Sequence, residues 1–144
     1  MAVETRNQSR ELSATQEKLL RLASYIHSIC EDSGIWYSLA AGSVLGAVRH
    51  GGFIPWDSDL DIFVRITDLA RFREAIMSTL PSEFRYYAWD REPNYHPAFD
   101  RLAYKGVSHY EVHVDIFPLI GVPEEPRKRD LFIKLCFLSY QFFR

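Results

Sequence analysis

Three aspartates occupy alternate positions in the segment WDSDLDIFV, which begins at Trp56. They are Asp57, Asp59 and Asp61, and most of their neighbours are apolar. Transferring a carboxylate out of water costs several kcal/mol unless a partner compensates for its charge. The composition of this segment therefore raises the question of which group offsets the charge of these carboxylates.

The same segment, from Ser58 to Val64, has the two-residue alternation of a β-strand. Asp59 and Asp61 should therefore project from one face, roughly 6.5–7 Å apart along the strand. Two carboxylates at this spacing repel each other unless a cation lies between them or one is protonated. Mg²⁺ prefers oxygen ligands and substrate phosphates. We therefore expect a Mg²⁺ cofactor, with Mn²⁺ as the alternative.

A third carboxylate, Asp115, lies in the strand-like segment VHVDIFPL. If this strand is a neighbour of the first, three carboxylates meet at one place. We therefore predict that Asp59, Asp61 and Asp115 are catalytic and bind the metal, with Asp115 acting as ligand, general base or both. The alternative is that Asp115 caps a turn and that Asp57 and Asp59 simply precede the sheet.

Gly42 and Ser43 follow a predicted strand, Ile35–Ala40, and precede the helical segment VLGAVRH. A turn before a helix start directs backbone N–H groups to where a phosphate can bind. We predict that Gly42 and Ser43 bind phosphate. Arg49, in the same segment, either neutralises phosphate or anchors the local fold.

Three more polar residues lie close to the predicted strands. Arg101 either projects toward a donor phosphate or lies on a solvent-exposed rim. His109 and His113 precede Asp115, and we interpret them as surface or packing residues because Mg²⁺ favours oxygen ligands.

Hydrophobic spacing and capping residues predict the remaining elements. Ser13 and Gln16 form a capping-box pattern at the start of a helix that Gly34 ends. Thr67 is predicted to cap a helix that ends at Pro81. Further elements are predicted at 84–89, 98–104 and 111–117 (strands) and from Arg127 or Arg129 onward (helix). The fold class is α+β, with a mixed sheet flanked by helices.

A chain of 144 residues fits a single domain, 1–144. We divide it into an N-terminal helix (13–33), a core (35–121) and an apolar C-terminal helix (127–144). The chain stops within that apolar helix, which favours a C-terminally truncated protein. The alternative is that the helix packs back on the domain.

Composition excludes several classes of function. The formal net charge is -2 and the basic residues form no stripe, which argues against nucleic acid as a partner. No stretch approaches the roughly 20 apolar residues of a membrane span, and the first residues do not form a signal peptide. Cys30 and Cys136 are predicted to be buried thiols. These features predict a cytoplasmic protein.

The segment GSVLGAVRHGGFIPWDSDLDIFV, which starts at Gly42, closely resembles the signature of the LicD family. The family pattern is Gly followed by Ser or Thr, then L-G-A-x-R-H, G-F-I-P-W-D and D-x-D, with D-I-F-P downstream. The likeness covers about Ile35 to Gly121 and extends to fukutin-related proteins. Ser58 differs from the acidic or polar residue of many members, and the usual C-terminal continuation is missing.

The resemblance implies a nucleotidyltransferase-like fold and transfer of a substituted phosphate group from a CDP-linked donor to a glycan hydroxyl, with release of CMP. Family donors include CDP-choline and CDP-ribitol, and the acceptors belong to lipopolysaccharide or glycoprotein biosynthesis. Matched position by position, Gly42 and Ser43 form the phosphate-binding turn. Asp59, Asp61 and Asp115 are the metal-binding carboxylates, whereas the role of Asp57 stays open.

Two other functions remain compatible with these residues. The chain is either an inactive accessory domain that binds a nucleotide or a partner, or a nucleotidyltransferase that releases pyrophosphate. The intact D-x-D argues against the inactive domain, because a dead copy is expected to lose a carboxylate.

Overall fold

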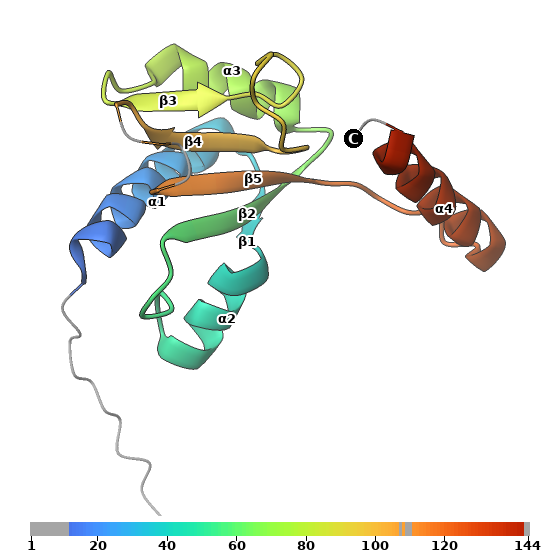
Figure 1. Ribbon diagram of the computed structural model, residues 1–144, viewed down its shortest axis with the longest axis horizontal. Coiled ribbons are helices and arrows are strands. Elements are labelled where there is room, and N and C mark those ends of the chain that lie inside the picture. The colour runs from blue at the N-terminus through green and yellow to red at the C-terminus, as the bar shows by residue number, and fades with distance from the viewer. Residues whose placement is uncertain (1–11, 107, 109–110, 143–144) are drawn as a thin grey trace, which may run out of the picture.

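The computed structural model describes residues 12–106, 108 and 111–142. This part of the chain forms four helices and five strands (Figure 1). In chain order they are α1 (Ala14–Ser33), β1 (Tyr37–Leu39), α2 (Ala41–His50), β2 (Asp59–Arg65), α3 (Leu69–Thr79), β3 (Phe84–Tyr87), β4 (Asp100–Tyr104), β5 (His113–Leu119) and α4 (Pro126–Phe142).

The five strands form one open mixed sheet in the order β1-β2-β5-β4-β3. β2 and β5 are parallel neighbours at its centre, and the other pairs are antiparallel. The predicted class, a mixed sheet flanked by helices, is confirmed. The central parallel pair decides the geometry of the site, because it aligns Asp59 with His113 and Asp61 with Asp115.

The hydrophobic core lies on the side of the sheet covered by α1 and α3, behind the strands in Figure 1. The strand β2 buries Leu60, Ile62 and Val64 toward this side and turns its odd-numbered residues the other way. The buried core residues include Leu19, Leu22, Ile26, Phe72, Ile76, Leu102, Val114 and Ile116. Burial of such side chains stabilises the fold by roughly 1.5–3 kcal/mol each. Because this stabilisation comes from the face that α1 and α3 cover, the opposite face can carry polar groups.

Capping residues in the sequence predicted the ends of α1 correctly but not the start of α3. The capping box of Ser13 and Gln16 and the left-handed Gly34 at the end of α1 are confirmed. The predicted cap Thr67 is wrong: Asp68 occupies the N-cap position of α3 and makes no side-chain capping bond. The predicted turn at Gly42 and Ser43 already lies within α2, which begins at Ala41.

A buried ion pair joins α3 to β4 beneath the sheet. Arg73 donates from Nε and Nη2 to the two carboxylate oxygens of Asp100, at 2.7 and 2.8 Å, and Asp100 is 0% exposed. The Tyr86 hydroxyl and the Trp89 backbone N–H donate to the same carboxylate, and Arg73 also pairs with Asp90. Asp100 thereby fixes the loop that starts after β3.

The last helix, α4, lies apart from the sheet (Figure 1). Its apolar residues Leu131, Ile133 and Leu135 are more than half exposed. Cys30 is buried as predicted, whereas Cys136 on α4 is exposed, so the prediction for Cys136 is wrong.

Among the described residues, no helix has the length and apolarity needed to cross a membrane.

The Arg73–Asp100 pair yields a first prediction. Arg73→Ala should lower the free energy of unfolding by about 3–5 kcal/mol, because it leaves Asp100 buried without its counter-charge. Arg71→Ala, which removes an exposed pair with Asp68, should cost about 1 kcal/mol or less. Urea unfolding of both variants measures the difference, and equal losses would contradict the importance of the buried pair.

The contact between α2 and the segment that follows it yields a second prediction. A Cβ added at Gly46 would lie 2.6 Å from the Gly52 carbonyl oxygen and 3.1 Å from the Ile54 nitrogen. Gly46→Ala should therefore destabilise the chain by about 1–3 kcal/mol, although alanine favours helix. Gly121→Ala, where no atom lies within 4 Å of the new Cβ, is the matched control in thermal unfolding.

Candidate active site

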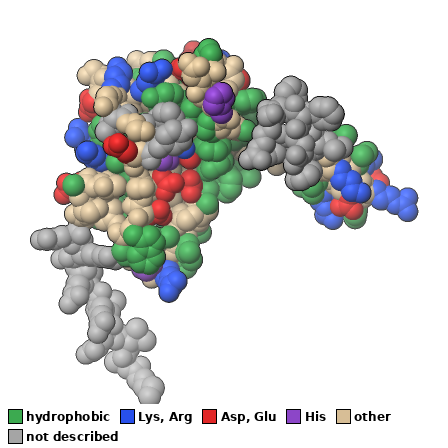
Figure 2. All heavy atoms as spheres, viewed as in Figure 1, with side chains coloured by type: hydrophobic (Ala, Val, Ile, Leu, Met, Phe, Trp, Pro, Cys, Tyr) green, Lys and Arg blue, Asp and Glu red, His purple; other side chains and the backbone are tan. Residues whose placement is uncertain are grey.

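The three predicted carboxylates lie on the face of the sheet opposite α1 and α3, here called the open face because none of the described core helices covers it. Register pairs Asp61 with Asp115 across the parallel strands β2 and β5, and Asp59 lies two residues before Asp61 on the same face. Figure 2 shows acidic side chains gathered near the middle of this face. The structure thus places Asp59, Asp61 and Asp115 on one face of the sheet. Alternation predicted the shared face of Asp59 and Asp61, and Asp115 joins them because β5 is the neighbour of β2.

Asp115 is held by an arginine from the adjacent strand. Arg101 donates from Nε to Oδ1 of Asp115 at 2.6 Å and from Nη2 to Oδ2 at 2.9 Å. Arg101 is only 4% exposed, and its guanidinium carbon lies within 6 Å of the ring centres of Tyr95 and Phe99. The alternative in which Arg101 lies on a solvent-exposed rim is therefore wrong. A bidentate pair of this kind fixes the orientation of the Asp115 carboxylate.

His113 also belongs to this cluster, because it lies opposite Asp59 in the register. Its Nε2 atom is 3.9 Å from Oδ2 of Asp59 and 3.7 Å from Oδ2 of Asp115, and the residue is 6% exposed. One ligand atom from each of the three residues lies within 4.8 Å of the others. His113 is therefore not a surface residue, which leaves the packing alternative and a ligand role for it, whereas His109 lies outside the described residues.

This donor set fits a divalent cation. Carboxylate oxygens suit Mg²⁺ and Mn²⁺, and an imidazole nitrogen is an accepted ligand of transition metals. Separations of 3.7–3.9 Å are too long for hydrogen bonds but leave an ion within reach of all three side chains.

The start of α2 lies against Asp61. The Asp61 N–H donates to the Ser43 hydroxyl at 2.8 Å, and the Ala40 N–H donates to the Asp61 carbonyl. The N-cap residue Ala40 provides no side-chain capping bond, and Ala41 has a φ of 41°, which is uncommon for a residue with a side chain. A helix start that lacks a capping side chain can accept an anion at its N–H groups.

Gly42 lies in the same first turn of α2. A Cβ added there would be 3.4 Å from Oδ2 of Asp57, so the backbone passes close to that carboxylate. Arg49, by contrast, is exposed in the last turn of α2, about 10 Å along the helix axis from Ser43. The structure therefore brings Gly42 and Ser43 to the carboxylates but leaves Arg49 at the far end of the helix.

Negative charge accumulates at this site. Burial and the charges of Asp59, Asp115 and Asp57 raise the pKa of Asp61 from 3.8 to about 6, and Arg101 opposes the rise. Burial, together with a hydrogen bond to Asp59 and its charge, also raises the pKa of Asp57. Arg101 alone does not neutralise the cluster, and a bound cation would remove the remaining repulsion.

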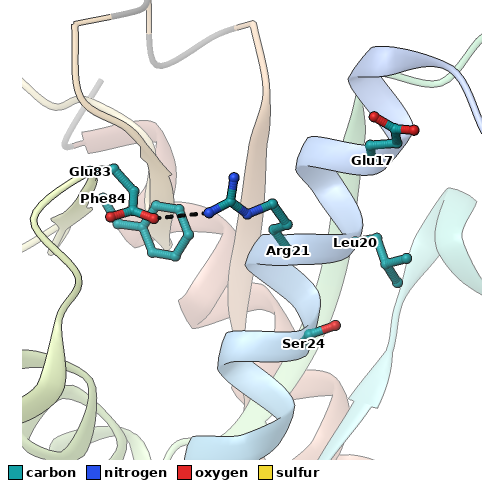
Figure 3. Close-up of a pocket in the computed structure, with 6 residues that line it drawn as sticks. All are labelled: Glu17, Leu20, Arg21, Ser24, Glu83 and Phe84. Atoms are coloured by element: carbon teal, nitrogen blue, oxygen red, sulfur yellow. Dashed lines mark hydrogen bonds and ion pairs between the residues drawn. The ribbon is translucent and has the colours of Figure 1, made fainter.

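Another depression lies along α1, where Glu17, Leu20, Arg21 and Ser24 line it together with Glu83 and Phe84 (Figure 3). It has a volume of about 480 Å³, and Arg21 crosses one side of it to pair with Glu83. None of the predicted site residues lines it, so it does not compete with the sheet face as the candidate site.

Sequence reasoning missed two features of the site. His113 could have been recognised by its spacing, since it precedes Asp115 by two residues and therefore shares its face. The left-handed backbone of Ala41 had no signal in the sequence, because alanine rarely adopts that conformation.

Comparison with known proteins identifies the family of this chain. Residues 34–141 match the family model described as the LicD/FKTN/FKRP nucleotidyltransferase domain. The chain belongs to the LicD family. The match contains every residue of the site described above.

Two curated relatives illustrate the family. The chain is 31% identical over 147 residues to the lipopolysaccharide cholinephosphotransferase LicD of Haemophilus influenzae, covering 90% of this chain and 55% of that protein. It is 34% identical over 103 residues to the human ribitol 5-phosphate transferase FKRP, covering 69% of this chain and 20% of that protein. This LicD-family chain thus spans about half the length of the first relative and a fifth of the second.

The raised pKa of Asp61 yields a third prediction. The folded chain binds this proton more tightly than the unfolded chain does, so the contribution of Asp61 to stability is greatest below about pH 4 and is lost as the pH rises through about 6. Asp61→Asn should therefore stabilise the metal-free chain at pH 7.5 by about 1 kcal/mol, a value reduced for solvent screening. Thermal unfolding in the presence of a chelator measures this gain.

The exposed residue Asp32 on α1 supplies the control, since Asp32→Asn makes the same change in net charge away from the site. A similar gain from both variants would attribute the effect to net charge. A loss of stability in Asp61→Asn at pH 7.5 would contradict the repulsion inferred among the carboxylates.

Proposed function

We propose that this chain transfers a substituted phosphate group, phosphocholine or a similar group, from a CDP-linked donor such as CDP-choline to a glycan hydroxyl, with release of CMP. Membership of the LicD family supports a transferase of this kind. The observation that carries the proposal is the meeting of Asp59, Asp61 and Asp115 on the open sheet face beside the uncapped start of α2. The family description supports a nucleotidyltransferase-like arrangement for this core.

In this proposal the metal lies between Asp59, His113 and Asp115, whose ligand atoms lie within 4.8 Å of one another. Asp61, the register partner of Asp115, is proposed as a further ligand. Mg²⁺ or Mn²⁺ bound there would neutralise charge on the diphosphate of the donor. Phosphoryl transfer needs positioning and charge neutralisation more than covalent chemistry from the protein. The carboxylates are suited to this task because their mutual repulsion favours a cation.

The phosphates of the donor bind, in this proposal, at the first turn of α2. Backbone N–H groups near Gly42 face the anion, and the Ser43 hydroxyl, which accepts a hydrogen bond from Asp61, keeps its own proton to donate. The positive end of the helix dipole adds to the attraction. Arg49 is proposed to contribute only long-range positive charge from the other end of α2.

Asp115 has two proposed roles, metal ligand and general base. Its bidentate pair with Arg101 supports the ligand role, because the guanidinium holds both carboxylate oxygens in a fixed orientation. Arg101 then acts by orienting Asp115, in addition to any attraction that it exerts on the phosphates.

The fourth prediction tests the reaction. With Mg²⁺ and glycan acceptors, the chain should release CMP from CDP-choline as the substituted phosphate passes to a glycan hydroxyl. The double variant Asp59→Ala/Asp61→Ala should reduce the rate by more than about a hundredfold, because loss of even supporting groups around a metal costs 10–100-fold. Chromatography of the nucleotide products measures the rate, and Asp32→Ala serves as the matched carboxylate control.

Other outcomes identify the rival functions. Pyrophosphate formed from CTP, without CMP from CDP-choline, would indicate nucleotidyl transfer. Binding of CDP-choline without CMP release, in the presence of glycan acceptors, would indicate an inactive nucleotide-binding domain.

A further inference from the structure

A small pocket lies between α1, α2 and the segment 52–60, immediately beside the site. Its volume is about 180 Å³. Seven of its eleven lining residues carry apolar side chains, among them Leu39, Ala47 and Phe53. Apolar cavities of roughly 150 Å³ hold ligands of about six heavy atoms, such as benzene. The pocket is therefore large enough for a small organic group but not for a nucleoside.

The pocket is continuous with the carboxylate cluster, since Ser43 and Asp59 line it and also belong to the site. A phosphate bound at the first turn of α2 would therefore place its substituent at the mouth of this pocket. Asp57 lies at the same mouth, 3.4 Å from the position that a Cβ of Gly42 would occupy.

The charge of the lining selects among possible substituents. Two carboxylates, Asp57 and Asp59, line the pocket, and none of its lining residues in the described part of the chain is basic. A polyol such as ribitol would bury several hydroxyl groups against apolar walls that offer few hydrogen-bond partners, which is unfavourable. A quaternary ammonium has no N–H group to satisfy. Its methyl groups suit apolar walls, and its charge suits both a carboxylate and the ring of Phe53.

We propose that this pocket receives the head group of the donor and selects a quaternary ammonium over a polyol, with Asp57 as the counter-charge. The proposal rests on the function proposed above and gives Asp57 a role that its position in the motif left open. In this proposal Asp59 binds the metal, which leaves Asp57 as the carboxylate that faces the head group.

The fifth prediction is tested by isothermal titration calorimetry of the whole chain with Mg²⁺ and without acceptor, against CDP-choline, CDP-ribitol and CDP. The chain should bind CDP-choline at least about tenfold more tightly than CDP-ribitol. Ala47→Leu, at an exposed position that lines the pocket, should fill the space and remove this preference while leaving the affinity for CDP unchanged.

Val48→Leu is the matched control, because Val48 is the next residue of α2, is 83% exposed and does not line the pocket. Equal affinities for both donors in a chain that binds CDP would overturn the pocket proposal and leave the proposed function standing. A preference for CDP-choline that survives Ala47→Leu would also overturn it. Failure of all three ligands to bind would overturn both proposals.

Discussion

Repulsion among carboxylates on the open face of the sheet is the constraint on which the site depends. Parallel pairing of β2 and β5 sets Asp61 opposite Asp115, with Asp59 on the same face. The arrangement is tolerable because Arg101 supplies a buried positive charge and because the face remains partly accessible to water. A site with this imbalance of charge favours a divalent cation.

Two consecutive residues of β4 serve the two sides of the sheet. Asp100 points into the core, where Arg73 neutralises it, and Arg101 points to the open face, where it neutralises Asp115. Each buried pair has low exposure and bidentate geometry, so each depends closely on the position of the strand. The stability of the core and the geometry of the site are therefore coupled through β4.

The contact of α2 with the segment that follows it positions the part of the site that lies beside the carboxylates, namely the start of α2 and Asp57. Gly46 allows the Gly52 and Ile54 backbone to approach the helix, which carries the chain back toward Asp57. The same approach closes one side of the head-group pocket around Ala47. Gly46 thus influences both the position of the proposed phosphate-binding turn and the shape of the pocket beside it.

The sequence alone determined the periodic and local features. Alternation identified the face that Asp59 and Asp61 share, and the capping box identified the start of α1, because both depend on residues close together in the chain. The motifs pointed to the family, and the comparison confirmed it.

Only the tertiary structure decided which strands are neighbours and what each polar side chain contacts. The pairing of Arg101 with Asp115, and the inclusion of His113 in the cluster, depend on the order of strands in the sheet. No local pattern in the sequence specifies the order of the strands. That order depends on long-range packing, in which α1 and α3 cover one face of the sheet and bury a core shared with the strands. The pocket beside Asp57 is likewise a property of packing, because its walls come from segments far apart in the chain.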